Sequence, residues 1–137
     1  MARPQERRRA ASSSPFEDRY GFSRAVRVGE RIWIAGTAPV WPDGSCPPDP
    51  AAQMRRCCEI VAGALAAVGA GPGDVVRTRM FITDRAVQDA VGRVHLEFFG
   101  AARPAATMVV VRGLLDPRWL VEIEAEAIVA GDVASGA

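Results

Sequence analysis

Two stretches of this sequence repeat apolar residues at the spacing of an α-helix, and each repeat forms a single stripe. The first stripe comprises Met54, Cys58, Val61, Leu65 and Val68, and the second comprises Val87, Val91, Val94 and Phe98. Asp49 and Asp84 precede the two stretches and suit N-caps, and Pro50 suits the first helical position. A helix with one apolar stripe buries only one face, so both helices require a second layer to cover them.

Five shorter apolar segments supply that layer as β-strands. They are residues 23–28, 31–35, 75–83, 107–112 and 120–129. Gly29 and Glu30 join the first two strands as a tight hairpin turn. Both helices must lie on the same side of the resulting sheet, because each has only one face to bury. We therefore predict a single-domain α/β (α+β) fold, a two-layer sandwich with a mixed β-sheet and the order β-β-α-β-α-β-β.

The two ends of the chain differ in composition from this domain. Residues 1–15 contain consecutive arginines and consecutive serines with almost no large apolar residue, which predicts a disordered basic tail. The folded domain is predicted over residues 16–131, followed by a flexible tail over residues 132–137. A short arginine cluster on a tail is usually solvated, and the formal net charge is only +1, so we expect no nucleic-acid partner.

The composition excludes several kinds of active site. The chain contains no lysine, which excludes a Schiff base, and a single histidine, His95, which excludes a site made of several histidines. We interpret His95 as a solvent-facing or core-edge side chain and Cys46, Cys57 and Cys58 as reduced, mostly buried thiols. We expect no metal and no cofactor. No apolar stretch reaches the ~20 residues that span a bilayer, so we expect no membrane association and a cytoplasmic protein.

The side chains of the last two core strands sort onto two faces, because they alternate along a strand. Val121, Ile123, Ala125 and Ala127 are predicted toward the helices, with Val76, Thr78, Met80 and Ile82 beside them. Leu120, Glu122, Glu124, Glu126 and Ile128 face the other way, with Arg77, Arg79, Phe81 and Thr83. This uncovered face mixes pairable charges with large apolar residues. It suits either solvent or a subunit interface, and the apolar residues favour an interface.

Five motifs stand in order between residues 20 and 130. They are Arg-Ile-Trp-Ile-Ala-Gly-Thr-Ala-Pro at residues 31–39, residues 73–84, Glu-Phe-Phe-Gly at 97–100, Arg-Pro-Ala at 103–105, and Val-Glu-Ile-Glu-Ala at 121–125. Together they resemble the RidA/YjgF family of reactive-intermediate deaminases, which hydrolyse enamines and imines. The resemblance implies the same order of elements, a homotrimer with a barrel-like core, and small-molecule sites in the clefts between subunits.

Several positions of the family's site are retained in this sequence. The resemblance places the acid that positions the attacking water at Glu122, the site glycine at Gly36, and a polar neighbour at Thr37. The backbone around Thr107 and Met108 is also implied as part of the substrate-binding cleft.

Three other positions have lost their polar groups. Phe22 stands where well-studied deaminases have a tyrosine, Ala35 where they have a serine, and Ala106 where an arginine grips the substrate carboxylate. A bidentate charge-assisted contact to a carboxylate contributes about 1.5–3 kcal/mol. An uncharged ligand loses nothing by this change, so the substitutions argue for a substrate without a free carboxylate.

Other cations are candidates for the missing charge. Arg79 is predicted on the uncovered face, and Arg24 and Arg112 on strands that flank the cleft. Each of these arginines either pairs with one of the glutamates or binds the ligand. If Arg79 holds Glu122, the pKa of Glu122 falls and it carries protons poorly; if Glu122 faces an apolar cleft, its pKa rises and it suits acid–base catalysis.

Two functions follow from this reading. The first is a homotrimeric, deaminase-like hydrolase that binds a small metabolite and processes a reactive imine or enamine without a free carboxylate. The alternative is a non-catalytic small-molecule-binding or regulatory trimer that has kept the fold and lost the chemistry. The hydrolase is the leading hypothesis.

Overall fold

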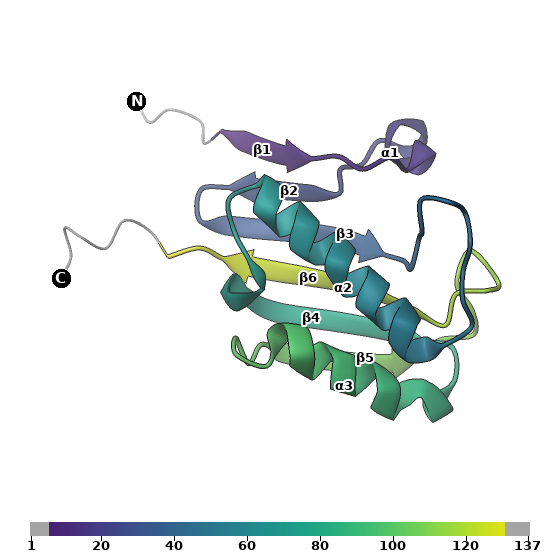
Figure 1. The fold of residues 1–137 in the computed structure, drawn as a ribbon. Helices are drawn as coiled ribbons and strands as arrows, with labels where there is room; N and C mark the ends of the chain where they lie inside the picture. The colour runs from purple at the N-terminus through teal and green to yellow at the C-terminus, as the bar shows by residue number, and fades with distance from the viewer. Residues whose placement is uncertain (1–5, 131–137) are drawn as a thin grey trace.

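The computed structural model describes residues 6–130, which form one six-stranded sheet with helices packed on it (Figure 1). The elements are β1 (Arg7–Ala10), α1 (Pro15–Tyr20), β2 (Ala25–Val28), β3 (Arg31–Thr37), α2 (Pro50–Ala67), β4 (Val75–Ile82), α3 (Gln88–Phe99), β5 (Ala105–Val110) and β6 (Val121–Ile128), with short 3-10 turns at Pro72–Asp74 and Arg85–Val87. The strand order is β1-β2-β3-β6-β4-β5, and only the β4–β5 pair is parallel. From β2 onward the predicted order and the mixed sheet are confirmed, with α2 and α3 on one face.

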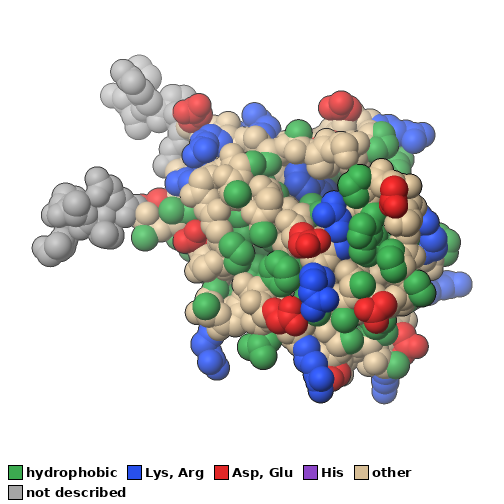
Figure 2. All heavy atoms as spheres, viewed as in Figure 1, with side chains coloured by type: hydrophobic (Ala, Val, Ile, Leu, Met, Phe, Trp, Pro, Cys, Tyr) green, Lys and Arg blue, Asp and Glu red, His purple; other side chains and the backbone are tan. Residues whose placement is uncertain are grey.

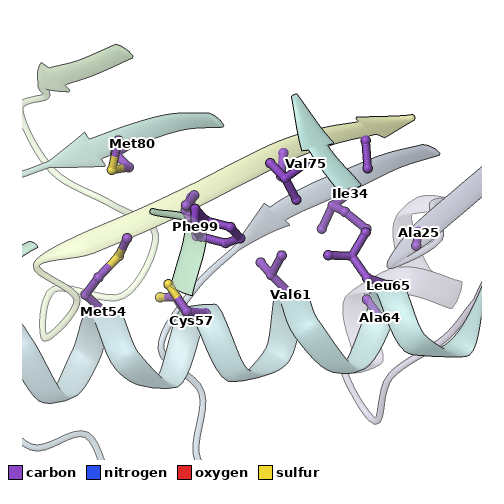
Figure 3. Close-up of a cluster of buried hydrophobic side chains, with 14 of the residues drawn as sticks. Ala25, Ile34, Met54, Cys57, Val61, Ala64, Leu65, Val75, Met80 and Phe99 are labelled. Atoms are coloured by element: carbon purple, nitrogen blue, oxygen red, sulfur yellow. The ribbon is translucent and has the colours of Figure 1, made fainter. Parts of the chain in front are cut away.

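Helix α2 supplies most of the core. The Asp49 side chain accepts a hydrogen bond from the Ala52 amide at 2.9 Å, and Pro50 occupies the first turn, as predicted. The predicted stripe of five apolar residues is fully buried, and Cys57 is buried beside it. Figure 3 shows Met54, Cys57, Val61 and Leu65 pointing from α2 toward the side where Ile34, Met80 and Phe99 lie.

Helix α3 begins later than the sequence suggests. Asp84 caps the 3-10 turn that precedes the helix, through a hydrogen bond from the Ala86 amide at 2.8 Å. Val91, Val94 and Phe99 form its buried face. His95 lies at the edge of the core, with its Nε2 atom 2.8 Å from the Thr78 hydroxyl, as expected for a structural histidine.

The N-terminal segment requires a correction. Residues 6–15 are not a disordered tail, since β1 pairs with β2 and the Ser14 side chain caps α1. The guanidinium of Arg27 donates to the Val68 carbonyl at 2.8 Å, and Arg8, opposite Arg27 in the sheet, approaches Gly69 at the same helix end. The C-terminus of a helix carries partial negative charge, which offsets the repulsion between two facing arginines. Residues 1–5 and the predicted tail 132–137 lie outside the described residues.

A β-bulge in β4 changes the predicted alternation. The pairing with β6 shifts between Val75 and Arg77, so Val75 is buried and Val76 is 44% exposed. The prediction that Val76 faces the helices is therefore wrong. Beyond the bulge the alternation is as expected, with Thr78, Met80 and Ile82 buried against the helices. In β6 the four predicted core residues are all buried.

The helix side of the molecule carries positive and negative side chains interspersed with hydrophobic ones (Figure 2). No helix within residues 6–130 is both long enough and apolar enough to cross a membrane.

One buried amide connects two loops to α2. Gln53 is fully buried, and its Nε2 atom donates to the carbonyls of Pro47 at 2.9 Å and Arg118 at 3.0 Å. Its Oε1 atom accepts from the Leu120 amide at 2.8 Å. The Gln53 side chain therefore holds the entry to β6 and the loop before α2 in place.

Replacing Gln53 with alanine should lower the free energy of unfolding by about 2–4 kcal/mol, because it leaves a cavity and removes partners of three buried backbone groups. Chemical denaturation of the purified variant measures this change. Gln88→Ala, at an exposed position with no side-chain hydrogen bond among the described residues, is the matched control. Equal stability of the two variants would contradict the role of Gln53.

Candidate functional site

The carboxylate of Glu122 is the centre of the candidate site. Glu122 lies on β6, opposite Phe81 of β4, on the sheet face that the helices leave uncovered. Its Oε2 atom packs against Gly36, where an added Cβ would lie only 2.8 Å from it. Within residues 6–130 the carboxylate has no hydrogen-bond or ion-pair partner. Burial raises the pKa of Glu122, the charge of Arg24 lowers it in part, and that of Glu124 raises it.

A bulge in β3 brings Gly36 to this carboxylate. Ile34 pairs with Ala125 and Thr37 with Ile123, so Ala35 and Gly36 together oppose one residue of β6. Thr37 is fully buried, and its hydroxyl donates to the Ala35 carbonyl at 2.7 Å. Thr37, expected to bind substrate, is thus buried behind the bulge and holds its shape.

Arg24 is the second charged residue of this site. Its Nη1 atom donates to the Gly36 carbonyl at 2.9 Å and to the Thr37 hydroxyl at 3.0 Å. Its guanidinium lies 5.8 Å from the centre of the Phe22 ring, which is 40% exposed. Burial lowers the pKa of Arg24, and the charges of Glu17 and Glu122 raise it.

The residue pattern alone predicts Arg24 only as a cation on a strand that flanks the cleft. The β2–β3 hairpin supplies a sharper signal, because the pairing of Ala25 with Ile34 places Arg24 opposite Ala35. A hydrogen bond from the Ala35 amide to the Arg24 carbonyl, at 3.0 Å, closes this pair. Counting back from the predicted turn at Gly29 would have placed Arg24 beside the site.

Arg79 does not hold Glu122. Its Nη1 atom lies 3.4 Å from a carboxylate oxygen of Glu124 and 3.4 Å from one of Glu126. Of the two alternatives for Glu122, the structure supports the one in which the pKa is raised by burial. The expected pairing of an arginine with the glutamates of this face is therefore present, and the partners of Arg79 are Glu124 and Glu126.

The remaining predicted residues lie on the edge strand β5. Ala106 is exposed and pairs with Thr78, on the helix side of the sheet. The Thr107 hydroxyl accepts a hydrogen bond from Arg77 at 2.7 Å, and Met108 packs against the core. Strand β4 separates β5 from β6, so one chain does not bring Ala106 next to Glu122.

Residues 13–129 match the protein family described as "Endoribonuclease L-PSP". The chain belongs to this family, the RidA/YjgF family. A curated protein of Streptomyces coelicolor, described as uncharacterized, is 39% identical over 88% of this chain and 90% of its own length. The 2-iminobutanoate/2-iminopropanoate deaminase of Escherichia coli is 34% identical over 78% of this chain and 84% of its own length.

Solved RidA/YjgF structures share the fold. Rv2704 of Mycobacterium tuberculosis, a protein of the YjgF/YER057c/UK114 family, superposes with a TM-score of 0.83 at 43% identity, covering 90% of this chain and all of that one. E. coli TdcF, solved with bound serine, gives a TM-score of 0.77 at 28% identity, covering 94% of this chain and all of that one.

Five of the site positions that the RidA resemblance predicts lie together at the end of β3. Phe22, Ala35, Gly36, Thr37 and Glu122 lie together there with Arg24, whereas Arg79 and the β5 residues lie elsewhere in the chain. Within one chain, strand β4 lies between the Glu122 group on β6 and the predicted residues on β5.

The cysteines do not add a nucleophile to this RidA site. Burial raises the pKa of Cys46, and the Gln53 amide contacts its sulfur at 3.5 Å. Cys57 and Cys58 are buried free thiols, and burial raises the pKa of Cys58 to about 12. In the part of the chain that the structure describes, no three His, Cys, Asp or Glu side chains are grouped to hold a metal ion.

Proposed function

We propose that this protein is a homotrimeric RidA-family hydrolase that processes a small reactive imine or enamine without a free carboxylate. The observation that carries the proposal is the half-buried Glu122 carboxylate, which packs against Gly36 and whose pKa is raised by burial. A carboxyl group with a raised pKa holds a proton closer to neutral pH, which suits general acid–base catalysis. The membership of the RidA/YjgF family, whose members deaminate imines and enamines, supports the same chemistry.

The reaction consumes one water for each imine and yields a carbonyl compound and ammonia. In its protonated form, Glu122 would donate a proton to the substrate nitrogen, which makes the imine carbon more electrophilic. In its ionised form, it would accept a proton from the attacking water and return it to the nitrogen. As the C–N bond breaks and ammonia leaves, it would take the remaining hydroxyl proton, which forms the carbonyl and regenerates the protonated carboxyl. One group that alternates between these forms suffices, and the reaction requires no redox step.

The lining of the site indicates the class of substrate. Phe22, Ala35 and Ala106 offer neither a hydroxyl nor a charge, and Arg79 is occupied by two glutamates. Arg24 is 9% exposed, and its Nη1 atom is committed to Gly36 and Thr37. The surface beside Glu122 is therefore mainly apolar and favours an uncharged ligand.

The proposed site requires an assembly, and we expect a homotrimer. The uncovered sheet face exposes Trp33 by 42% and Ile128 by 44%, close to the paired charges of Arg79 and Glu126. Burial of such a face against other copies removes the apolar side chains from water. Light scattering coupled to size exclusion should give three times the 14.6 kDa chain mass.

A Trp33→Asp variant should shift this equilibrium toward smaller species, because it places a carboxylate opposite Glu126. Leu115→Asp, at a loop position that is 92% exposed, is the control and should leave the mass unchanged. A wild-type monomer at micromolar concentration would contradict both the interface and the inter-subunit cleft.

Assays with two sets of substrates test the proposed activity. Neutral imines, generated in place by an amine oxidase, and carboxylate-bearing imines, generated by an amino-acid oxidase, are followed by release of ammonia above the spontaneous rate. Acceleration with the neutral set supports the proposal. Binding of small molecules without acceleration of either set would favour the second candidate, a non-catalytic trimer, for which the loss of polar groups at Phe22, Ala35 and Ala106 is the argument.

A further inference from the structure

The buried guanidinium of Arg24 and the carboxylate of Glu122 contact the same glycine from two directions. The Nη1 atom of Arg24 donates to the Gly36 carbonyl at 2.9 Å, and the Glu122 Oε2 atom packs where a side chain of Gly36 would be. Because Arg24 also donates to Thr37, it bridges the two residues at the end of the β3 bulge. The position of Gly36, and with it the seat of the Glu122 carboxylate, depends on this contact.

A buried counter-ion holds Arg24 in this position. Glu17 of α1 is 6% exposed, and its Oε2 atom lies 4.0 Å from the Arg24 Nε atom. Glu17 is itself fixed by Ser12, whose amide donates to Oε1 at 3.0 Å and whose hydroxyl donates to Oε2. The Arg24 Nε atom is buried and has no hydrogen-bond partner in the described part of the chain. One guanidinium is thus shared between Glu17 on the N-terminal side and the bulge on the other.

We propose that Arg24 is a positioning residue for Glu122: it fixes the bulge against which the Glu122 carboxylate packs and supplies the positive charge that faces this carboxylate. The importance of Arg24 for catalysis rests on the proposed function, whereas its effect on the position and the pKa of Glu122 does not. Glu17 is the second residue of this arrangement, because its negative charge offsets part of the positive charge of Arg24 that acts on Glu122.

The charged and titratable groups around Glu122 are few. Arg24 faces it from the β2 side, Glu124 lies two residues along the same strand, and the buried Cys57 thiol lies below it on α2. The neighbour on β4 is Phe81, which is not charged. Loss of the Arg24 charge removes the only one of these groups that stabilises the carboxylate form, so the pKa of Glu122 should rise. Loss of the Glu17 charge leaves Arg24 less neutralised, so the pKa of Glu122 should fall.

A direct titration of Glu122 tests this inference without any need for turnover. The side-chain carboxyl carbon of Glu122, in protein labelled with ¹³C-glutamate and assigned by its loss in Glu122→Gln, is followed by NMR against pH. Arg24→Gln should raise the titration midpoint by about one pH unit, since a nearby opposite charge shifts a carboxyl by at least that amount. Arg24→Lys keeps the charge and should restore at least half of the difference.

Two further variants keep the test decisive. Arg93→Gln removes an exposed arginine on α3 and should leave the midpoint unchanged. If Arg24→Gln does not fold, Glu17→Gln still reports, and the midpoint should then fall. An unchanged Glu122 midpoint in the folded Arg24 and Glu17 variants would overturn the inference, even in a fully active enzyme. A different outcome is that the Glu122 midpoint rises in Arg24→Gln and falls in Glu17→Gln while the wild-type protein accelerates no imine hydrolysis. That result would support the inference about Arg24 and refute the proposed function.

Discussion

Glu122→Gln should reduce imine hydrolysis by about 10²–10⁴-fold, the usual contribution of an acid–base group. Glutamine preserves the shape of the side chain that packs against Gly36 but neither gives up nor accepts a proton in this pH range. The measurement is the rate of ammonia release from neutral imines above the spontaneous rate. Glu97→Gln is the matched control and should retain wild-type turnover, because Glu97 lies on the helix side and pairs, within residues 6–130, only with the exposed Arg55.

The stability of the same variant separates a catalytic role from a structural one. Burial raises the pKa of Glu122 above its value in the unfolded chain, so the folded state binds the proton more tightly. The stability linked to this proton is present below the unfolded pKa and is lost as pH rises through the folded pKa. At neutral pH the variant should therefore be at least as stable as the wild type and should remain a trimer.

A buried partner of Arg79 would behave differently, since its removal leaves an arginine uncompensated and lowers stability. Arg79 pairs with Glu124 and Glu126, which argues against that role for Glu122. Unchanged turnover in an intact trimer of the Glu122→Gln variant would remove this residue from the chemistry and favour the non-catalytic trimer.

The sequence predicts the core of the fold because the periodic patterns there are local. The stripe on α2 and the alternation along β6 each follow from neighbours within one element, and both agree with the structure. The formation of strand β1 depends instead on groups that are distant in the sequence. These are β2 and the C-terminus of α2, where Arg27 binds the Val68 carbonyl. A short arginine-rich segment gives no local signal of such partners.

The positions of single site residues could be predicted from the sequence, whereas the ion pairs among several charged residues could not. Glu122 and Gly36 are adjacent as the family resemblance implies, because the bulge in β3 brings them together. The pairing of Arg79 depends on the register between β4 and β6, in which Arg79 lies opposite Glu124 and diagonal to Glu126. Alternation places two arginines and three glutamates on one face but does not determine which of them meet.

Restoring an arginine at position 106 should raise turnover of carboxylate-bearing imines. A bidentate guanidinium contact contributes about 1.5–3 kcal/mol, which corresponds to about tenfold to somewhat over a hundredfold in rate. Ala106 is exposed on an edge strand, so the longer side chain displaces no core residue. Because β4 separates β5 from Glu122 in one chain, the new guanidinium is expected to act beside the Glu122 of a neighbouring subunit.

Two controls isolate the effect of the Ala106→Arg charge in its own place. Ala106→Gln has similar reach without charge and should not raise the rate. Ala105→Arg adds the same charge one residue away, opposite Arg77, and should raise the rate less than Ala106→Arg if the position and not the charge alone is responsible. The turnover of neutral imines should not increase in any of the three variants, since these substrates have no carboxylate to bind.

If the wild type already turns over carboxylate-bearing imines as fast as the Ala106→Arg variant, another arginine supplies the contact. Arg79→Gln is then the next variant, because Arg79 is the half-exposed cation on the uncovered face and its release from Glu124 and Glu126 would make it available.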